Sequence, residues 1–285
     1  MPKNKKTIGG VTTYQRLGKE VSRPSRNEVG NVTRSENQDL QRRRWYNAIN
    51  LWRAFVNDGW KPRFQEKAPG QTDYARFTSY ALQGTTIYLT MQQGREGGCV
   101  LVPVMVSVGS LPTIKTHFDG VGVTSDIRVG NFVITPQTTV SQLVRAIIYN
   151  NSNILKGDSL TFVAGDQQVR PSDNMPVVLF RHCRLDLDPR DSRLLSSLRG
   201  SDEAFTIRDG LLASTVSQGA CTWVQSRPGS LEQYSTQELW CGNDEMIQRY
   251  HSREAYEASS QSYGGIHPNG ILEPDALPDD MAGRQ

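Results

Sequence analysis

Apolar and polar residues alternate with a helical period near the start of the chain. Between residues 35 and 58 an apolar stripe repeats at i, i+3, i+4 and i+7, and it consists of Trp45, Ala48, Ile49, Trp52, Phe55 and Val56. This spacing predicts an amphipathic helix that buries the stripe in the core. Ser35 and Gln38 have the spacing of a capping box, and Gly59 stands where a helix often ends.

Three further helices are predicted from shorter patterns. In the first, residues 73–81, the inward-facing residues are Tyr74, Phe77, Tyr80 and Ala81. In the second, Thr139 and Gln142 form another capping box, and the apolar face consists of Val140, Leu143, Val144, Ile147 and Ile148. The third spans residues 244–256.

From residue 85 onward, short β-branched or apolar runs bounded by Gly, Pro, Asn or Asp predict strands. These runs are residues 86–91, 100–108, 127–134, 160–164, 177–187, 205–208, 211–216, 221–225 and 236–240. Gly94–Gly98 is interpreted as the hairpin turn between the first two runs. The predicted fold class is α+β and β-rich, with antiparallel sandwich or barrel-like sheets and a few amphipathic helices.

The ends of the chain have a different composition from this predicted domain. We expect a basic extended arm at residues 1–34, a helical segment at 35–84, a β-rich domain with one inserted helix at 85–242, and a helix with an acidic extended tail at 243–285. Glycines and Pro24 interrupt any helix in the arm. We therefore predict an arm that is disordered alone and becomes ordered in an assembly.

Charge is distributed unevenly along the chain. Residues 1–63 hold 14 Lys and Arg against 5 Asp and Glu, a net charge of +9, so the totals of 32 and 29 leave 18 against 24, or −6, for the rest. A basic arm on an acidic body indicates a negatively charged partner, either nucleic acid or a protein surface such as another copy of the chain. A solvated tail that only aids solubility is the alternative. The residues predicted to bind a partner are Lys3, Lys5, Lys6, Ile8, Tyr14, Arg16, Leu17, Arg23, Arg26, Arg42, Arg43 and Arg44.

Composition argues against a membrane-spanning, secreted or disulfide-rich protein. The chain has 36% hydrophobic residues, and no run of eighteen apolar residues indicates a membrane span. No apolar stretch follows the basic N-terminus, so a secretory signal is not expected. Four cysteines scattered over the chain are typical of reduced thiols rather than of a disulfide framework.

Motifs for catalysis are incomplete. Gly157-Asp158-Ser159-Leu160 matches the nucleophile block of a serine esterase family, but no histidine has an aspartate three residues before it, as that family requires. His182 and Cys183 are adjacent, so on a strand they point to opposite faces, and a buried thiol is favoured over a shared metal ion. A Cys–His pair assembled through space stays open as an alternative. We expect no catalytic, cofactor or metal site.

Acids alternate with leucines after the predicted strand 177–187. The strand rule places Leu185 and Leu187 inward and Asp186 and Asp188 outward, as a solvated face. Calcium binding is the alternative, although the spacing is not that of an EF-hand loop.

The order of features at both ends of the chain resembles a known family. A Lys-rich start precedes Gly9-Gly10 and a helix that contains Gln and Arg, and the chain later contains a Trp-centred strand at 219–224 and a Ser-Thr-Gln strand at 234–240. This is similar to an uncharacterised family common in Bacteroidales genomes and their phages and prophages. The resemblance implies a phage virion component that is made in the host cytoplasm.

Three hypotheses about function follow. The first is a virion structural or assembly protein, such as a capsid-associated, connector or tail component, that contacts copies of itself as a homo-oligomer and other virion proteins through the arm. The second is a nucleic-acid-binding protein that uses the arm and Arg42–Arg44. The third is an enzyme whose site is assembled from distant residues. No membrane partner is expected.

Overall fold

The computed structural model describes residues 6–8, 11–16, 19–24, 36–83, 89, 91–118, 122–170, 172, 175–216 and 219–239 of the 285 in the chain. The predicted helix at 244–256, the acidic tail and the predicted capping serine Ser35 lie outside the described residues. So does most of the predicted strand 86–91.

The described chain is a mixed α+β fold rich in strands, as the sequence predicted. The N-terminal sheet has the order β1-β2-β3, at Lys6–Ile8, Val11–Arg16 and Lys19–Pro24. The central sheet has the order β13-β12-β8-β9, at Gln233–Tyr234, Ala220–Arg227, Ser159–Arg170 and Met175–Asp186. Two smaller sheets are β14-β5-β4, at Gln237–Leu239, Val104–Val108 and Arg63–Phe64, and β10-β11-β7-β6, at Thr206–Arg208, Leu211–Ser214, Val123–Arg128 and Thr116–Phe118.

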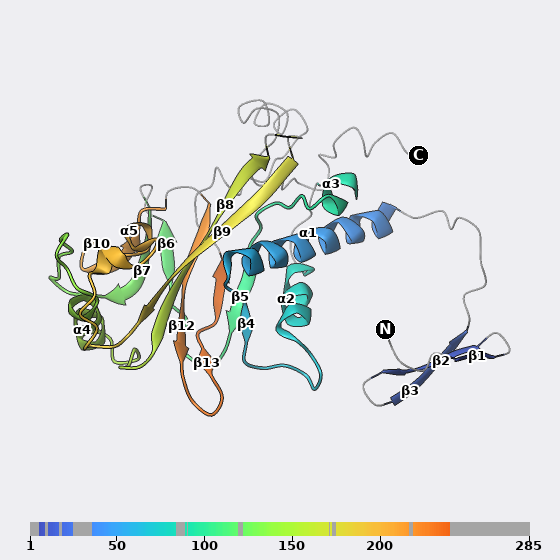
Figure 1. Cartoon of the computed structure of the whole chain (residues 1–285), viewed down its shortest axis with the longest axis horizontal. Helices are drawn as coiled ribbons and strands as arrows, with labels where there is room; N and C mark the ends of the chain where they lie inside the picture. Colours follow the sequence, from blue (N-terminus) through green and yellow to red (C-terminus); the bar gives the residue numbers. More distant parts are fainter. Residues whose placement is uncertain are drawn as a thin grey trace.

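These sheets are antiparallel apart from the parallel β4–β5 pair. Among the described strands no sheet closes on itself, so the barrel that the sequence allowed does not form. The helices are α1 Glu36–Asp58, α2 Asp73–Ala81, α3 Met91–Arg95, α4 Val140–Asn150, the 3-10 turn Leu195–Ser197 and α5 Ser201–Ala204. Figure 1 shows the central sheet between α1 and α2 on one side and α4 on the other.

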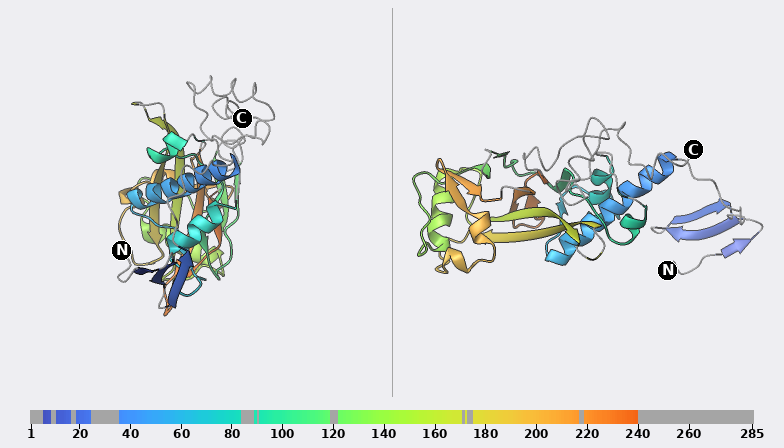
Figure 2. Two further views of the ribbon diagram at one scale, coloured as in Figure 1. Left: turned by 90° about the vertical axis from the view of Figure 1, so that its right-hand side faces the viewer. Right: turned by 90° about the horizontal axis from the view of Figure 1, so that it is seen from above.

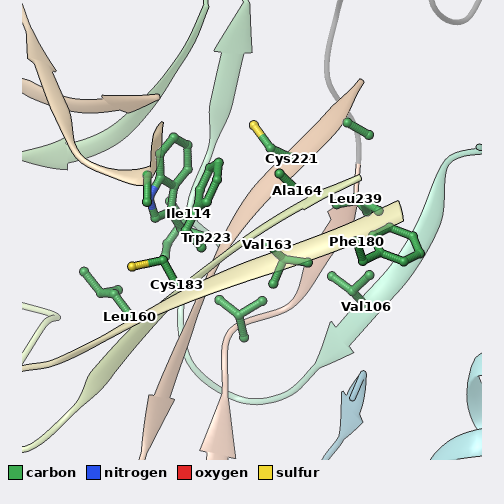
Figure 3. Packing of buried hydrophobic residues seen from close by; sticks show 14 of the residues in the cluster. Val106, Ile114, Leu160, Val163, Ala164, Phe180, Cys183, Cys221, Trp223 and Leu239 are labelled. Atoms are coloured by element: carbon green, nitrogen blue, oxygen red, sulfur yellow. The ribbon is translucent and has the colours of Figure 1, made fainter. Parts of the chain in front are cut away.

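The central strands β8 and β12 are buried on both faces. Residues 159–165 of β8 and 220–226 of β12 are all buried, and the Trp223 ring lies 5.1 Å from that of Phe162. Figure 3 shows the central sheet meeting Val106 of β5 and Leu239 of β14 in one core. Burial on both faces explains why these strands read as short apolar runs without clear alternation.

Helix α1 has the predicted bounds, and its buried face coincides with the predicted stripe only in part. The residues of α1 that the core covers are Asn47, Ala48, Asn50, Leu51 and Phe55. Trp45 and Val56 belong to the predicted stripe, yet they are 45% and 37% exposed. The predicted stripe is therefore confirmed at Ala48 and Phe55 and wrong at its two ends. The buried face also includes two asparagines that the apolar pattern did not contain.

The buried asparagines of α1 are satisfied by one loop. Asn47 Nδ2 donates to Val100 O at 3.1 Å, and Val100 N donates to Asn47 Oδ1 at 2.7 Å. Asn50 Nδ2 donates to Gly94 O at 2.8 Å and to Gly98 O at 2.7 Å. Because each buried polar group has a partner, asparagine is compatible with the core at these positions.

The predicted hairpin turn at Gly94–Gly98 is wrong, because helix α3 begins at Met91 and runs into it. Gly94 lies against α1, and a Cβ built on it would stand 2.8 Å from the Cβ of Tyr46. Glycine is therefore needed here for close approach of two helices rather than for a turn.

The predicted start of helix α4 is confirmed, whereas one predicted strand is too long. Helix α4 starts at Val140, and its capping box is confirmed, with Thr139 N donating to Gln142 Oε1 at 2.8 Å. The predicted strand at 127–134 is wrong beyond Arg128, because Gly130 adopts a φ of 63° and turns the chain. A positive φ is incompatible with a continuing strand.

Candidate interaction surfaces

The predicted partner-binding residues fall into two groups in the structure. Lys6 and Ile8 lie in β1, Tyr14 and Arg16 in β2, and Arg23 in β3. The other group, in the first half of α1, consists of Arg42, Arg43 and Arg44. Outside the described residues are Lys3, Lys5, Leu17 and Arg26.

The arm contains a local sheet that sequence reasoning did not predict. Strands of three, six and six residues pair antiparallel, and the register places Ile8 opposite Val11 and Tyr14 opposite Val21. In Figure 1 and in the right-hand view of Figure 2 this sheet lies apart from the other described strands and helices. The disorder expected for an isolated arm stays a prediction.

This N-terminal sheet is too small to make a core of its own. Of the fifteen residues in its strands, only Ile8, Val11, Tyr14, Val21 and Pro24 are apolar. A small sheet needs one hydrophobic face or a packing partner to be stable in water. The sheet therefore requires support from another surface.

The first half of α1 forms a second exposed surface. Helix α2 packs on the later part of α1, where Trp52 lies 5.6 Å from Tyr74 between ring centroids. Trp45 and Arg42 precede that contact and are exposed. The predicted aromatic stripe is thus divided into a packed part and an exposed part.

A third surface is an apolar groove beside α4. It has a volume of about 540 Å³ and is lined by Phe132, Gln142, Arg145, Ala146, Ile148, Tyr149 and Pro189. Tyr149 is 89% exposed. Val133, which follows Phe132 in the sequence, is 71% exposed. Arg145 Nη2 donates to Pro189 O at 3.1 Å, which fixes one wall of the groove.

Sequence reasoning did not select this groove. Val140, Leu143, Val144 and Ile147 form the predicted buried face of α4, whereas Ile148 is only partly buried. Tyr149 lies outside that stripe on an otherwise amphipathic helix. Tyr149 was the available signal in the sequence. An aromatic residue outside the buried face of a helix is either a local packing contact or an exposed binding position.

The esterase-like motif lies inside the core. Ser159 begins β8, is buried, and has its hydroxyl oxygen 2.7 Å from that of Ser226 on β12. Asp158 beside it accepts from Arg227 Nε at 2.8 Å and from Gln225 Nε2 at 2.7 Å. Both motif residues therefore join β8 to β12, and the Ser159 hydroxyl is closed off from an ester.

Electrostatics at Asp158 favour its charged form. Burial by itself raises the pKa of this carboxyl, but hydrogen bonds from Arg227, Leu155 N and Gln225 outweigh burial, so the pKa is below its ordinary value. The ion pair between Asp158 and Arg227 therefore links the start of β8 to the end of β12.

The remaining candidate residues are Cys183, His182 and the acids Asp186 and Asp188. Cys183 is buried, and burial raises the pKa of its thiol to about 11. His182 faces the other side of β9, where its Nδ1 pairs with Asp58 at the end of α1. Asp186 and Asp188 are exposed while Leu185 and Leu187 are buried, as predicted.

Comparisons with known proteins give no relative, since no protein family, curated protein or solved structure matches the chain. Within the described ranges, no cluster of three or more His, Cys, Asp or Glu residues is placed to hold a metal ion. Of the helices that the structure describes, none combines the length and the apolar character that a bilayer span needs.

Proposed function

We propose that this protein is a structural subunit that assembles with copies of itself and with other proteins of a phage virion, as a capsid-associated, connector or tail component. The observation that carries the proposal is the N-terminal sheet, β1–β3, which has main-chain pairing but too few apolar positions for a core. A chain with such a segment gains stability when another surface covers it.

The exposed surfaces of the body support the same proposal. The α4 groove and Trp45 offer apolar area on separate elements. Solvent-exposed apolar patches of this kind mark contact sites between proteins. A subunit whose arm binds a different surface on its neighbour forms head-to-tail contacts. Such contacts give rings when they close and filaments when they do not.

Charge favours association of the arm with a neighbour, whose negative charge lies mostly after residue 239, where 8 Asp and Glu stand against 3 Lys and Arg. Residues 1–63 have a net charge of +9, and the remaining residues have −6. Opposite charges on the two parts steer them together at low ionic strength.

Electron microscopy of the purified, concentrated protein tests the proposal. Rings, tubes or filaments that disappear when residues 1–34 are deleted are the expected result. Monomeric particles for the full chain at every concentration would contradict it.

A nucleic-acid-binding role is the second candidate, because Arg42 and Trp45 are exposed in the first half of α1, where Arg43 and Arg44 are partly buried. Binding through phosphates gives a log–log salt slope of roughly −0.9 per phosphate on duplex DNA. A steep slope that flattens in an Arg42→Ala/Arg43→Ala/Arg44→Ala variant, together with no self-association, would favour this candidate over assembly.

A further inference from the structure

The α4 groove is an apolar site that carries a single charged side chain. Five of its seven lining residues are apolar, and Arg145 is the only charged one. Tyr149, whose ring lines the groove, is 89% exposed and therefore open to a partner. Grooves lined by aromatic residues bind proline-containing segments in the polyproline II conformation, with an apolar face of the segment against the rings.

Arg145 has hydrogen-bond donors left for a bound carboxylate. Its Nη2 donates to Pro189 O at 3.1 Å, which fixes the guanidinium beside the groove and uses one of its five N–H donors. Asp191, two residues after Pro189, pairs with Arg193 at 2.7 Å. Among the described residues no carboxylate forms an ion pair with Arg145. The groove therefore suits a segment that is apolar on one face and acidic beside it.

The sequence after β14 contains a segment with this chemistry. Ile271, Pro274 and Leu277 recur at every third position, which is the period of a polyproline II helix and places them on one face. Proline fixes its own φ and restricts the residue before it to extended conformations, so Pro274 and Pro278 favour this conformation. The acids of the same stretch are Glu273, Asp275, Asp279 and Asp280.

The point where the chain leaves the described fold favours a groove on another copy. β14 ends at Leu239 and pairs with β5. Figure 1 shows β5 beside α2, whereas α4 lies on the other side of the central sheet. A donor segment that starts on one side of a subunit and an acceptor groove on the other are the arrangement of a head-to-tail contact.

We infer that residues 271–278 of one copy bind the α4 groove of a second copy. Ile271, Pro274 and Leu277 meet the aromatic rings, and the acids between them meet Arg145. This inference rests on the proposed assembly function and names one of its contacts. Because an eight-residue segment binds weakly by itself, the contact adds to that of the N-terminal arm through multivalency.

Disulfide trapping between two full-length preparations with different tags tests the inference. One preparation carries Ala146→Cys in the groove, and the other carries Leu272→Cys or Ala276→Cys in the segment. Cys241→Ser is present in both. The matched control replaces Ala146→Cys by Leu231→Cys, at a 77% exposed residue between β12 and β13. We expect the groove cysteine to give mixed-tag disulfide about tenfold above the control, because binding strongly raises the effective concentration.

An exchange of charges tests the contact with Arg145. Arg145→Glu in the groove preparation should lower the yield of mixed-tag disulfide by about two- to fivefold, because an attractive pair becomes repulsive. Glu273→Arg together with Asp275→Arg in the segment preparation should restore the yield. A loss that this exchange does not reverse would overturn the pairing of the arginine with the segment.

Three results would overturn the inference in different ways. If the full-length protein sediments as an oligomer but the groove cysteine gives no more mixed-tag disulfide than the control, the inference is wrong while the proposed function stands. A disulfide that forms only within one chain carrying both cysteines assigns the groove to the chain's own segment. A full chain that is monomeric at every concentration contradicts the proposed function, and with it this contact between copies.

Discussion

Asn47 on helix α1 and Val100 hydrogen-bond each other in both directions, with Asn47 Nδ2 3.1 Å from Val100 O and Val100 N 2.7 Å from Asn47 Oδ1. The side-chain amide thus takes the place of a neighbouring strand for this buried residue. The pair fixes α1 to the loop that supports the β8–β9 hairpin.

Removing this amide should destabilise the fold strongly. Asn47→Ala leaves the buried N–H and C=O of Val100 without their partner, and each unsatisfied group costs about 1–3 kcal/mol. We expect a loss of about 2–4 kcal/mol in the free energy of unfolding, measured by urea denaturation. Asn57→Ala, an exposed asparagine on the same helix, is the control and should change it by less than about 0.5 kcal/mol. Equal effects would show that the amide pair is not needed.

The observed buried face of α1 makes a second prediction. Phe55 is fully buried and stacked on Phe180, so Phe55→Ala should cost about 3–5 kcal/mol of unfolding free energy. Trp45→Ala removes a half-exposed ring and should cost less than about 1 kcal/mol. The reverse order in thermal and urea unfolding would show that Trp45, and not Phe55, packs in the core.

Asp158 should contribute to the pH dependence of stability. Because its folded pKa is lower than its unfolded value of about 3.9, its ionised form stabilises the fold fully above that value. The contribution is lost as pH falls through the lower, folded pKa. We therefore expect Asp158→Asn to weaken the fold at neutral pH and to reduce the loss of stability between about pH 5 and pH 2. Asp186→Asn, which removes an exposed carboxylate at the end of β9, is the control and should change the free energy of unfolding at neutral pH by less than about 1 kcal/mol.

Thiol reactivity should report the burial of the cysteines. Burial raises the pKa of Cys99 to about 12 and that of Cys183 to about 11, so almost no thiolate is present at pH about 8. In a Cys241→Ser variant, labelling with an aromatic disulfide reagent should be slow in buffer and complete in denaturant. Rapid labelling of the native variant would mean that the core around these thiols opens readily.

Sequence patterns predicted the parts of the fold that follow from local periodicity. The bounds of α1 and α2, the capping box of α4 and the burial of Leu185 and Leu187 all come from spacing within one segment. The two asparagines on the buried face of α1, Asn47 and Asn50, could not be found this way because they are polar. Only their pairing with a loop about fifty residues away makes them core residues.

The candidate surfaces were predictable only in part. Basic and apolar residues in the arm indicated a partner, but the pairing of β1–β3 depends on register, which no composition rule supplies. The pairing of β12 with β8, which ends at Gly165, joins segments that lie far apart in the sequence. Strand pairing over long sequence distances is a property of the whole fold, so neither feature has a local signature.

Sedimentation velocity of the full chain and of a chain lacking residues 1–34, over a range of concentrations, tests the central claim that the arm assembles subunits. We expect the full chain to form oligomers that persist from about 0.1 M to about 0.5 M salt, because main-chain pairing and apolar burial are not weakened by screening. The shortened chain should keep the unfolding midpoint of the body and sediment as a monomer. Identical association of the two chains, or a full chain that is monomeric throughout, would contradict the claim.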